Sequence, residues 1–443
     1  MSVLTLPASQ AYCRTIVSLN SPLSRRDLLR TALAGAGLVS AASILAACGG
    51  PAPTNAPGAP PPAGAAPTSA PAQSAPASGG GGTLKIGVLS TNSGPFSAIG
   101  QDIQRATELY LAQNNNVLNG LQVTVVAEDE GATTQDALSK GRKLIEQDKV
   151  DVLTGLVLSN NALAMRDVID GAKVPTIITN AGAVDLTGSK KSKYIYRVSF
   201  SNWQSGGSLG KYAFGNTGKK AIAMAPDYAA GQETAGGFMD TFKAAGGQII
   251  DSIFPPLGNS DYAPYLGKIK PANPEVVFAF FSTGDAIKFL TQWSQFVGAD
   301  IPLIGFGLNT PDVTAALGKT ALLAKYTTSN YDPSLDNPVN KAFIAAFKQR
   351  FNRDPQLAQY QYDGMILLGK ALEKTKGDKS PDALAEAMSG LSYDGVRGTV
   401  KIDPDTHGLV LPYYRIDTVQ DGDTVTTKVG AKLGDFSPTA QID

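Results

Sequence analysis

Apolar and polar positions alternate along the chain in two different periods from Leu84 onward. Short β-branched and apolar runs predict strands, and segments with apolar residues at every third or fourth position predict helices between them. The predicted strands of the first half cover residues 84–90, 121–128, 152–158 and 175–179. The predicted helices cover residues 99–110, 134–147 and 161–169. Repeated strand–helix–strand units of this kind predict a parallel sheet with helices on both faces.

The same alternation starts afresh after the segment "YIYRVSFSN" (194–202). Predicted strands follow at 220–226, 248–254, 275–281 and 302–307, with helices at 232–245 and 285–297. Later residues predict helices at 337–351 and 356–374 and then β-like runs at 396–403 and 409–417. Two α/β units in 443 residues predict two lobes with a sheet each, and the late elements suggest that the chain crosses between them more than once.

Small polar side chains gather where the predicted strands end. In open parallel sheets, ligands lie outside the carboxyl ends of the strands. The clusters there are Ser90–Phe96, Ser159–Asn161, Thr179–Ala183, Asp227–Gly231, Phe281–Gly284 and Phe306–Asn309. They contain no nucleophile with an acid/base pair, no phosphate loop and no clustered metal ligands. We therefore expect a protein that binds a small molecule without transforming it, with no cofactor and no metal.

One cluster, in the segment "TGLVLSNNALA" (154–164), follows a strand that looks fully buried. Ser159 and Asn160 stand where the free N–H groups of the next helix point outward, a favourable place for an anion. Serine is also a favoured helix cap without any ligand, and that alternative stays open.

Charge and rare residues exclude several classes. Lys plus Arg and Asp plus Glu both number 38, so nothing favours a nucleic-acid partner. Cys13 and Cys48 precede the folded part, which excludes a disulfide or thiolate metal site within it. The single histidine, His407, lies in "PDTHGL" and is expected to be a solvated turn residue.

The N-terminal segment, residues 1–47, predicts an export signal. Arg25 and Arg26 precede a charge-free stretch rich in Ala, Gly and Leu, as in a twin-arginine signal. An ordinary secretory signal with two arginines is the alternative.

"LAAC" at 45–48 resembles a bacterial lipobox, in which Cys48 becomes the acylated first residue. Residues 49–82 contain only Gly, Pro, Ala, Ser, Thr, Asn and Gln, which cannot form a core. We expect residues 48–82 to be a disordered tether, and the protein to be lipid-anchored to the extracytoplasmic face of the cell membrane.

The folded chain resembles the leucine/isoleucine/valine-binding protein family, the solute-binding components of branched-chain amino acid ABC transporters. The resemblance rests on the order and spacing of "IGVLSTNSGPFSAIGQDIQRATELYLAQNN", "GLVLSNNALAMRDVIDGAKVPTIITNAGAVDLTG", "YIYRVSFSN", "APDYAAGQE" and "GADIPLIGFG". It implies a type I periplasmic binding fold, with two doubly wound parallel-sheet lobes, three hinge crossings and a ligand in the cleft. The implied partners are an ABC permease and its ATPase, with the protein as a monomer.

The resemblance also implies lobe boundaries and site residues. The domain would span 84–430, with a first lobe of about 84–200 and 331–390 and a second of about 201–330 and 391–430. Ser159 matches the serine that binds the ligand's carboxylate, and Ala181 to Ala183 match a loop that holds the charged end. The candidate ligand-binding residues are Ser93, Phe96, Ser159, Asn160, Asn180, Ala181, Gly182, Ala183, Asp227, Tyr228, Phe281, Ser282, Thr283, Phe306 and Gly307.

One departure from the family bears on specificity. Family members that bind branched-chain amino acids carry an acidic residue for the ammonium group where this chain has Gly307. Because a buried ammonium without an anion is costly, the ligand could be an aromatic or other ammonium-free carboxylate. Asp227 could restore the charge, although its position also suits the start of a helix, and Phe280 and Phe281 could be ligand contacts or core.

Three functions remain in view at this point. A branched-chain-type amino acid receptor for import is the family default, and an apolar carboxylate receptor is the alternative. A sensor for a signalling partner is a further alternative, since the same fold serves sensing.

Overall fold

The computed structural model describes residues 82–355 and 357–439. Arg25, Arg26 and Cys48, which carry the predicted export signal and lipid anchor, lie outside these residues.

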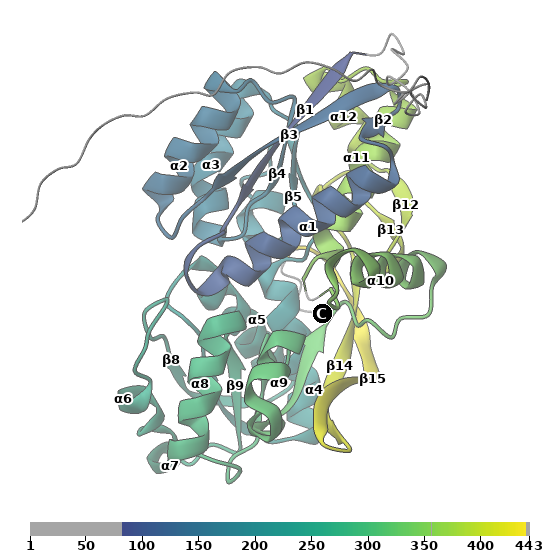
Figure 1. Ribbon diagram of the computed structural model, residues 1–443. Coiled ribbons are helices and arrows are strands. Elements are labelled where there is room, and N and C mark those ends of the chain that lie inside the picture. The colour runs from purple at the N-terminus through teal and green to yellow at the C-terminus, as the bar shows by residue number, and fades with distance from the viewer. Residues whose placement is uncertain (1–81, 356, 440–443) are drawn as a thin grey trace, which may run out of the picture. The chain divides into compact units, whose positions relative to one another are not determined.

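The first lobe is built on a sheet with the strand order β2-β3-β1-β4-β5-β6. Its strands are β1 (Thr83–Ser90), β2 (Val117–Leu118), β3 (Leu121–Asp129), β4 (Val152–Gly155), β5 (Thr176–Ile178) and β6 (Ile195–Arg197). All neighbours pair in parallel except the short β2, with Val88 opposite Ala127 and Thr154. Helices α2 (Thr134–Arg142) and α3 (Ser159–Ala172) lie on one face, and α1 (Ser97–Gln113) and α11 (Gln359–Lys374) lie on the other (Figure 1).

The second lobe is built on a sheet with the order β15-β14-β11-β10-β9-β7-β8. Its strands are β7 (Lys220–Met224), β8 (Gln248–Ile253), β9 (Val276–Phe280), β10 (Leu303–Phe306), β11 (Ala324–Ser329), β14 (Leu411–Asp421) and β15 (Thr424–Phe436). Strand β14 pairs antiparallel with both β11 and β15, and the other neighbours pair in parallel. The helices are α4 (Asn202–Asn216), α5 (Ala229–Ala244), α6 (Ala263–Leu266), α7 (Ile269–Ala272), α8 (Thr283–Phe296) and α9 (Pro311–Leu317).

Strand β9 shows why the second sheet is covered on both faces. Val277 and Ala279 join a core with Phe289 and Trp293 of α8. Val276 and Phe278 point the opposite way and join a core with helices α4 and α5. A strand buried on both faces is apolar at every position, which is the pattern that the sequence has there. The predicted α/β class with two parallel-dominated sheets is confirmed.

The chain crosses between the lobes after β6, after β11 and again before β14. Between the second and third crossings lie α10 (Pro338–Phe351), α11, α12 (Pro381–Met388), β12 (Ser392–Gly395) and β13 (Gly398–Lys401). We expected the return to the second lobe near residue 391. The structure places it later, because Tyr393 and Val400 of β12 and β13 are buried in the core of the first lobe.

Strand β4 is shorter than the predicted run 152–158, and its end forms the rim of the site. Gly155 has φ 103° and Leu156 has φ 58°, so the chain turns out of the sheet there. A Cβ on Gly155 would lie 2.3 Å from the carbonyl oxygen of Leu89, so only glycine fits. The apolar residues 156–158 therefore form the loop that leads into α3.

Candidate functional site

A cavity of about 130 Å³ lies at the carboxyl ends of strands from both sheets. The first lobe contributes Ser159, Gly182 and Tyr360, among others, and the second contributes Tyr228, Phe280 and Phe306. This is the position that the parallel-sheet rule predicts for a ligand.

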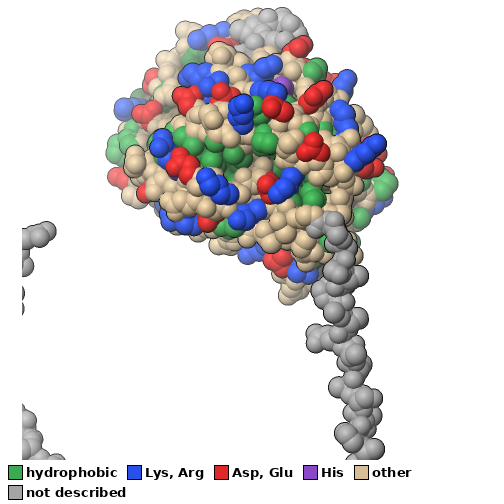
Figure 2. Space-filling view, turned by 90° about the horizontal axis from the view of Figure 1, so that it is seen from above, with side chains coloured by type: hydrophobic (Ala, Val, Ile, Leu, Met, Phe, Trp, Pro, Cys, Tyr) green, Lys and Arg blue, Asp and Glu red, His purple; other side chains and the backbone are tan. Residues whose placement is uncertain are grey.

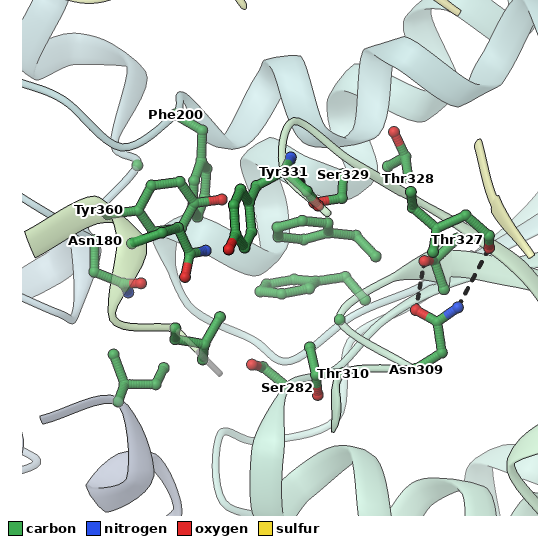
Figure 3. Close-up of a pocket in the computed structure, with 18 of the residues that line it drawn as sticks. Asn180, Phe200, Ser282, Asn309, Thr310, Thr327, Thr328, Ser329, Tyr331 and Tyr360 are labelled. Atoms are coloured by element: carbon green, nitrogen blue, oxygen red, sulfur yellow. Dashed lines mark hydrogen bonds between the residues drawn. The ribbon is translucent and has the colours of Figure 1, made fainter. Parts of the chain in front are cut away.

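Aromatic rings from both lobes surround the cavity. Phe200 of the first lobe lies 5.5 Å from Tyr360 and 5.4 Å from Phe306 of the second lobe, between ring centroids. Phe306 lies 5.5 Å from Phe280, which stacks on Tyr228 at 6.5 Å. Figure 3 shows Phe200 and Tyr360 projecting toward the centre of the pocket. Such an arrangement suits a flat apolar group, because offset and edge contacts between rings are favourable.

Hydrogen-bond donors stand beside these rings at the start of α3. Ser159 Oγ accepts a bond of 3.0 Å from Asn202 Nδ2, so its own proton is available for a ligand. Among the described residues, the backbone N–H groups of Ser159 and Gly182 have no acceptor. Together with the positive end of the helix dipole, these donors can receive a carboxylate.

A fully buried acid, Glu130, holds the loop in front of α3. It accepts bonds of 3.1 Å and 2.9 Å from the backbone N–H groups of Val157 and Leu158, and one from Thr91 Oγ1. Burial raises the pKa of Glu130 to about 7, against the effect of these hydrogen bonds. Glu130 thus caps the loop and leaves the next N–H group, that of Ser159, for the cavity.

Hydrogen bonds bridge the lobes around the cavity. Asn160 Oδ1 accepts from the N–H of Ala229 at 2.9 Å, and Thr283 Oγ1 donates to the carbonyl of Pro95 at 2.7 Å. Glu233 on α5 accepts from Val184 N of the first lobe at 3.1 Å and, within the second lobe, from Asn202 Nδ2 at 2.8 Å. Burial raises the pKa of Glu233. These contacts hold the two lobes together over the site.

The position of the missing acidic residue is closed to any side chain in this backbone. Gly307 has φ 78°, and a Cβ there would lie 2.4 Å from the carbonyl oxygen of Phe281. The backbone of the turn after β10 therefore excludes an acidic side chain at this position.

The structure brings part of the predicted set to the cavity wall. These residues are Ser159, Asn180, Gly182, Tyr228, Ser282, Phe306 and Gly307. Asn180 also donates to the carbonyl of Val157, which ties the loops after β4 and β5 together.

Phe281 was expected to contact the ligand, and it belongs to the core instead. It is fully buried and packs on Phe289 and Tyr262, with ring centroids 4.3 Å and 5.2 Å away. Successive residues of a strand face opposite sides of the sheet. Phe280 therefore lines the cavity and Phe281 faces α8.

Asp227 does not provide the alternative countercharge. It is exposed, accepts a hydrogen bond of 2.8 Å from Gln232 Nε2, and lies outside the cavity wall. Asn160 and Thr283 also lie outside the wall, where their side chains make the bonds between the lobes described above.

The remaining predicted residues support the wall from behind or lie beside it. Ala181 and Ala183 are buried, and their backbone groups bond to Leu156 and Arg197. Ser93 is exposed, and Phe96 is buried in the first lobe's core.

His407 is not the solvated turn residue that we expected. It is buried and stacks on Tyr196, with ring centroids 4.3 Å apart, and its Nδ1 lies near the carbonyls of Ser192 and Ile195. Burial lowers the pKa of His407. The sequence around His407 predicts a turn but contains no signal that the turn packs back against β6.

Several wall residues were not among those predicted from the sequence. Phe200 and Asn202 lie in the segment "YIYRVSFSN", which marks the boundary between the two α/β units and was not expected to contact the ligand. Two later segments also reach the wall. The end of β11 and the crossing after it contribute Thr327, Thr328, Ser329, Tyr331, Asp332 and Pro333, and the start of α11 in the first lobe contributes Leu357, Gln359 and Tyr360. No period or strand-end pattern in the sequence places these distant segments together.

Two negative findings apply to the described residues. They contain no group of three or more His, Cys, Asp or Glu side chains that could hold a metal ion. No helix among them is long and apolar enough to cross a membrane.

Comparison with known proteins identifies the family. The family model "Periplasmic binding protein" matches residues 83–423. A curated relative from Brucella melitensis, Leu/Ile/Val-binding protein homolog 6, is 29% identical over 341 residues, covering 75% of this chain and 86% of that one.

Two solved structures of ABC-transporter solute-binding proteins are also similar. One, from R. palustris in complex with benzoate, is 30% identical with a TM-score of 0.74, covering 80% of this chain and 97% of that one. Another, from Rhodopseudomonas palustris BisB5 in complex with 3,4-dihydroxy benzoic acid, is 31% identical with a TM-score of 0.75, covering 81% and 98%. The fold, the cavity between its lobes and these matches show that the chain belongs to the periplasmic binding protein family, as an extracytoplasmic solute-binding protein of the ABC-transporter type and not an enzyme.

Proposed function

We propose that this protein captures an aromatic carboxylate in the cavity and delivers it to the permease of an ABC importer. The observation that carries the proposal is the set of rings from both lobes, Phe200, Tyr228, Phe280, Phe306 and Tyr360, around a single cavity. The hydrogen-bond donors at Ser159 and Gly182 bind the ligand's carboxylate in this proposal. The chain has no acidic side chain at Gly307 to pair with an ammonium group.

The size of the cavity supports a ligand with one ring. Its volume is about 130 Å³, and an apolar cavity of about 150 Å³ in another protein holds one benzene molecule. The relatives crystallised with benzoate and 3,4-dihydroxy benzoic acid are consistent with a ligand of this class.

A branched-chain-type amino acid is the second candidate, and Asp332 favours it. Asp332 is the one acidic residue in the cavity wall and is buried. Its Oδ1 accepts from the backbone N–H and hydroxyl of Ser334, at 2.8 Å and 2.6 Å, as in a turn cap. In our proposal Asp332 keeps this structural role and does not meet a ligand cation.

A thermal-shift screen separates the two candidates. Residues 83–443 would be melted with benzoate, hydroxybenzoates and 4-methylpentanoate, and with leucine, isoleucine, valine and phenylalanine. A ligand at about a hundred times its Kd adds about 2.7 kcal/mol of stability. We expect shifts from the aromatic acids alone, and shifts from the amino acids alone would overturn the proposal.

The variant Asp332→Asn sharpens the screen, because asparagine keeps an oxygen for Ser334 and loses the charge. We expect it to bind aromatic acids as the parent chain does. An amino acid receptor that depends on Asp332 would lose its ligand in this variant.

We also propose that the protein is exported through the twin-arginine signal at Arg25 and Arg26 and anchored by a lipid on Cys48. The lipobox-like "LAAC" and the core-free segment 49–82 support this proposal. Mass spectrometry of the mature protein should find Cys48 as the first residue with the added mass of acyl chains, and Cys48→Ser in the full chain should lack that mass and keep its signal. A mature chain that begins elsewhere, or carries no acyl mass, would contradict the anchor.

A further inference from the structure

The hydroxyl of Ser159 belongs to a chain of hydrogen bonds that starts at a backbone group. Val184 N donates to Glu233 Oε2 at 3.1 Å, and Asn202 Nδ2 donates to the same oxygen at 2.8 Å. Asn202 Nδ2 also donates to Ser159 Oγ at 3.0 Å. The chain therefore runs from the loop after β5 through the starts of α5 and α4 to the start of α3.

The direction of these hydrogen bonds is set by the backbone donor. A backbone N–H cannot accept, so the Glu233 oxygen that it contacts must be an acceptor. That oxygen can then bind only the NH₂ end of the Asn202 amide, because the carbonyl end would bring two acceptors together. Burial raises the pKa of Glu233, and its hydrogen bonds from Asn202 and Val184 oppose this. With or without a proton on its other oxygen, Oε2 stays an acceptor.

The Asn202 amide in turn sets the direction of the bond to Ser159. An amide NH₂ group has two hydrogens, and Asn202 Nδ2 gives one to Glu233 and one to Ser159. Ser159 Oγ is therefore an acceptor toward Asn202, and its own proton has no acceptor among the described residues. The cavity, which Ser159 lines, is the place where that proton can be used.

The backbone holds Asn202 in place, while Glu233 stands behind it. Asn202 N donates to the carbonyl of Gly182 at 2.7 Å, and a Cβ on Gly182 would lie 2.2 Å from Asn202 Oδ1, so the amide packs closely on that loop. Glu233 is half-buried and lies outside the cavity wall. It can therefore affect a ligand only through Asn202 or through the contact between the lobes.

We propose that Glu233 is a positioning residue for the ligand's carboxylate, because it fixes the Asn202 amide so that the Ser159 hydroxyl donates into the cavity. Without an acceptor at this position, the amide can turn over. Ser159 would then donate to Asn202 Oδ1 and present a lone pair to the carboxylate. The inference rests on one part of the proposed function, the binding of a carboxylate by Ser159, and is independent of the rest of the ligand.

The test is a double-mutant cycle, with benzoate affinities from calorimetric titration of residues 83–443. In the parent chain, Glu233→Leu should weaken benzoate binding about 5- to 50-fold. In a chain that already carries Ser159→Ala, the same change should cause only the loss due to the bond with Val184, at most about 3-fold. No hydroxyl is left to position in that background.

Two further variants separate positioning from a merely structural role. Glu233→Gln keeps an oxygen for Val184 and Asn202, and it should bind benzoate as the parent chain does. Thr283→Val removes a different bond between the lobes, the one to the carbonyl of Pro95, and it should change the affinity by the same factor with and without Ser159→Ala. If Glu233→Leu does not fold, Asn202→Leu takes its place in the cycle, since it breaks the chain and leaves the bond between Glu233 and Val184.

The outcomes distinguish this inference from the proposed function. Equal losses from Glu233→Leu in both backgrounds would show that Glu233 only helps to hold the lobes together, which overturns the inference and leaves the aromatic carboxylate receptor standing. A loss in Glu233→Gln as large as in Glu233→Leu would also overturn it. If the parent chain binds leucine and not benzoate, the proposed function fails, and the same cycle run with leucine decides the inference, because leucine also carries a carboxylate. If neither binds, both fail.

Discussion

At the scale of single residues, we expect Ser159 to make the interaction on which ligand binding most depends. Its Oγ already accepts from Asn202, so its proton is free for a carboxylate oxygen of the ligand. Ser159→Ala should weaken binding of the preferred acid by about 1–3 kcal/mol, the usual cost of a lost hydrogen bond to a charged group.

Calorimetry on Ser159→Ala measures this change directly. Ser294→Ala, an exposed serine on α8 outside the cavity wall, should bind as the parent chain does. Equal affinities for parent and Ser159→Ala, with the melting temperature unchanged, would remove Ser159 from the site.

Phe306 provides a second residue-level prediction. It stands beside Gly307 and contacts both Phe200 and Phe280, so Phe306→Asp replaces a ring contact by an anion in the cavity. We expect binding of benzoate-type acids to be lost and leucine to gain relative to its ammonium-free analogue, 4-methylpentanoate. No change in the ratio of these two affinities would contradict the placement of Phe306 in the site.

The sequence predicts single site residues only where a strand end places them. Ser159 and Gly182 follow predicted strands, Phe306 lies at the end of one, and all three line the cavity. Tyr360 and Gln359 follow no strand, and they reach the wall because the chain has returned to the first lobe and begins α11 there, which no local pattern encodes. The choice between Phe280 and Phe281 depended on which face of β9 the ligand occupies, and a strand buried on both faces does not show this in its sequence.

At the scale of elements, the start of α3 depends on an acid from another segment. The residue before the helix, Leu158, has no capping side chain, and Glu130 after β3 binds the N–H groups of Val157 and Leu158. The pKa of Glu130 is about 7 in the folded protein against 4.5 ordinarily. The folded state therefore holds this proton more tightly than the unfolded state does.

This difference predicts a pH dependence of stability with a definite sign. Between about pH 4.5 and pH 7, the unfolded chain has lost the proton and the folded chain keeps it, so the free energy of unfolding falls as pH rises. The contribution is about 3 kcal/mol over that window. Glu130→Gln should make the fall shallower by about this amount in urea titrations at several pH values, while the part due to other buried acids such as Glu233, whose pKa burial also raises, should stay.

The control for that experiment is Glu146→Gln, at an exposed position, which should keep the slope of the parent chain. An unchanged slope in Glu130→Gln would show that Glu130 does not hold its proton as the structure indicates.

Element types were more predictable than their ends. The apolar runs gave most strands of both sheets, because inner parallel strands are apolar throughout. Strand β15 was missed because its sequence, TVTTKVGAKLGDF, is rich in Thr, Lys and Gly and contains no apolar run. Its side chains are mostly half-buried or exposed. Strand β4 was predicted too long because the left-handed turn at Gly155 and Leu156 has no polar signal.

At the scale of the whole molecule, we expect ligand retention to depend on hydrogen bonds that join the two lobes. Asn160 with Ala229 and Thr283 with Pro95 join the lobes outside the cavity wall. Asn160→Ala combined with Thr283→Ala should favour the open arrangement without touching the ligand. Each lost bond contributes about 1 kcal/mol, and we expect the ligand to dissociate about 5- to 30-fold faster.

Stopped-flow release kinetics and small-angle X-ray scattering of the ligand-free protein test this prediction. The radius of gyration should rise in the double variant and stay unchanged in Asn216→Ala, which alters an exposed asparagine of α4. Identical release rates for parent and double variant would mean that these bonds do not hold the lobes.

The two-lobe organisation followed from the restart of the alternation after residue 202, since each α/β unit needs its own sheet. The place where the chain returns to the second lobe could not be predicted, because β12 and β13 form a small antiparallel pair that still packs in the core of the first lobe.

The net charge of zero also has a counterpart in the structure. Acidic and basic side chains are interspersed on the face drawn in Figure 2, without a field of one sign.

The most direct test of the account is a crystal structure of residues 83–443 with a hydroxybenzoate bound. We predict that the carboxylate lies within hydrogen-bond distance of Ser159 Oγ, with the ring among Phe200, Phe280 and Phe306. A ligand found outside this cavity, or an amino acid retained there with its ammonium group on Asp332, would contradict the account.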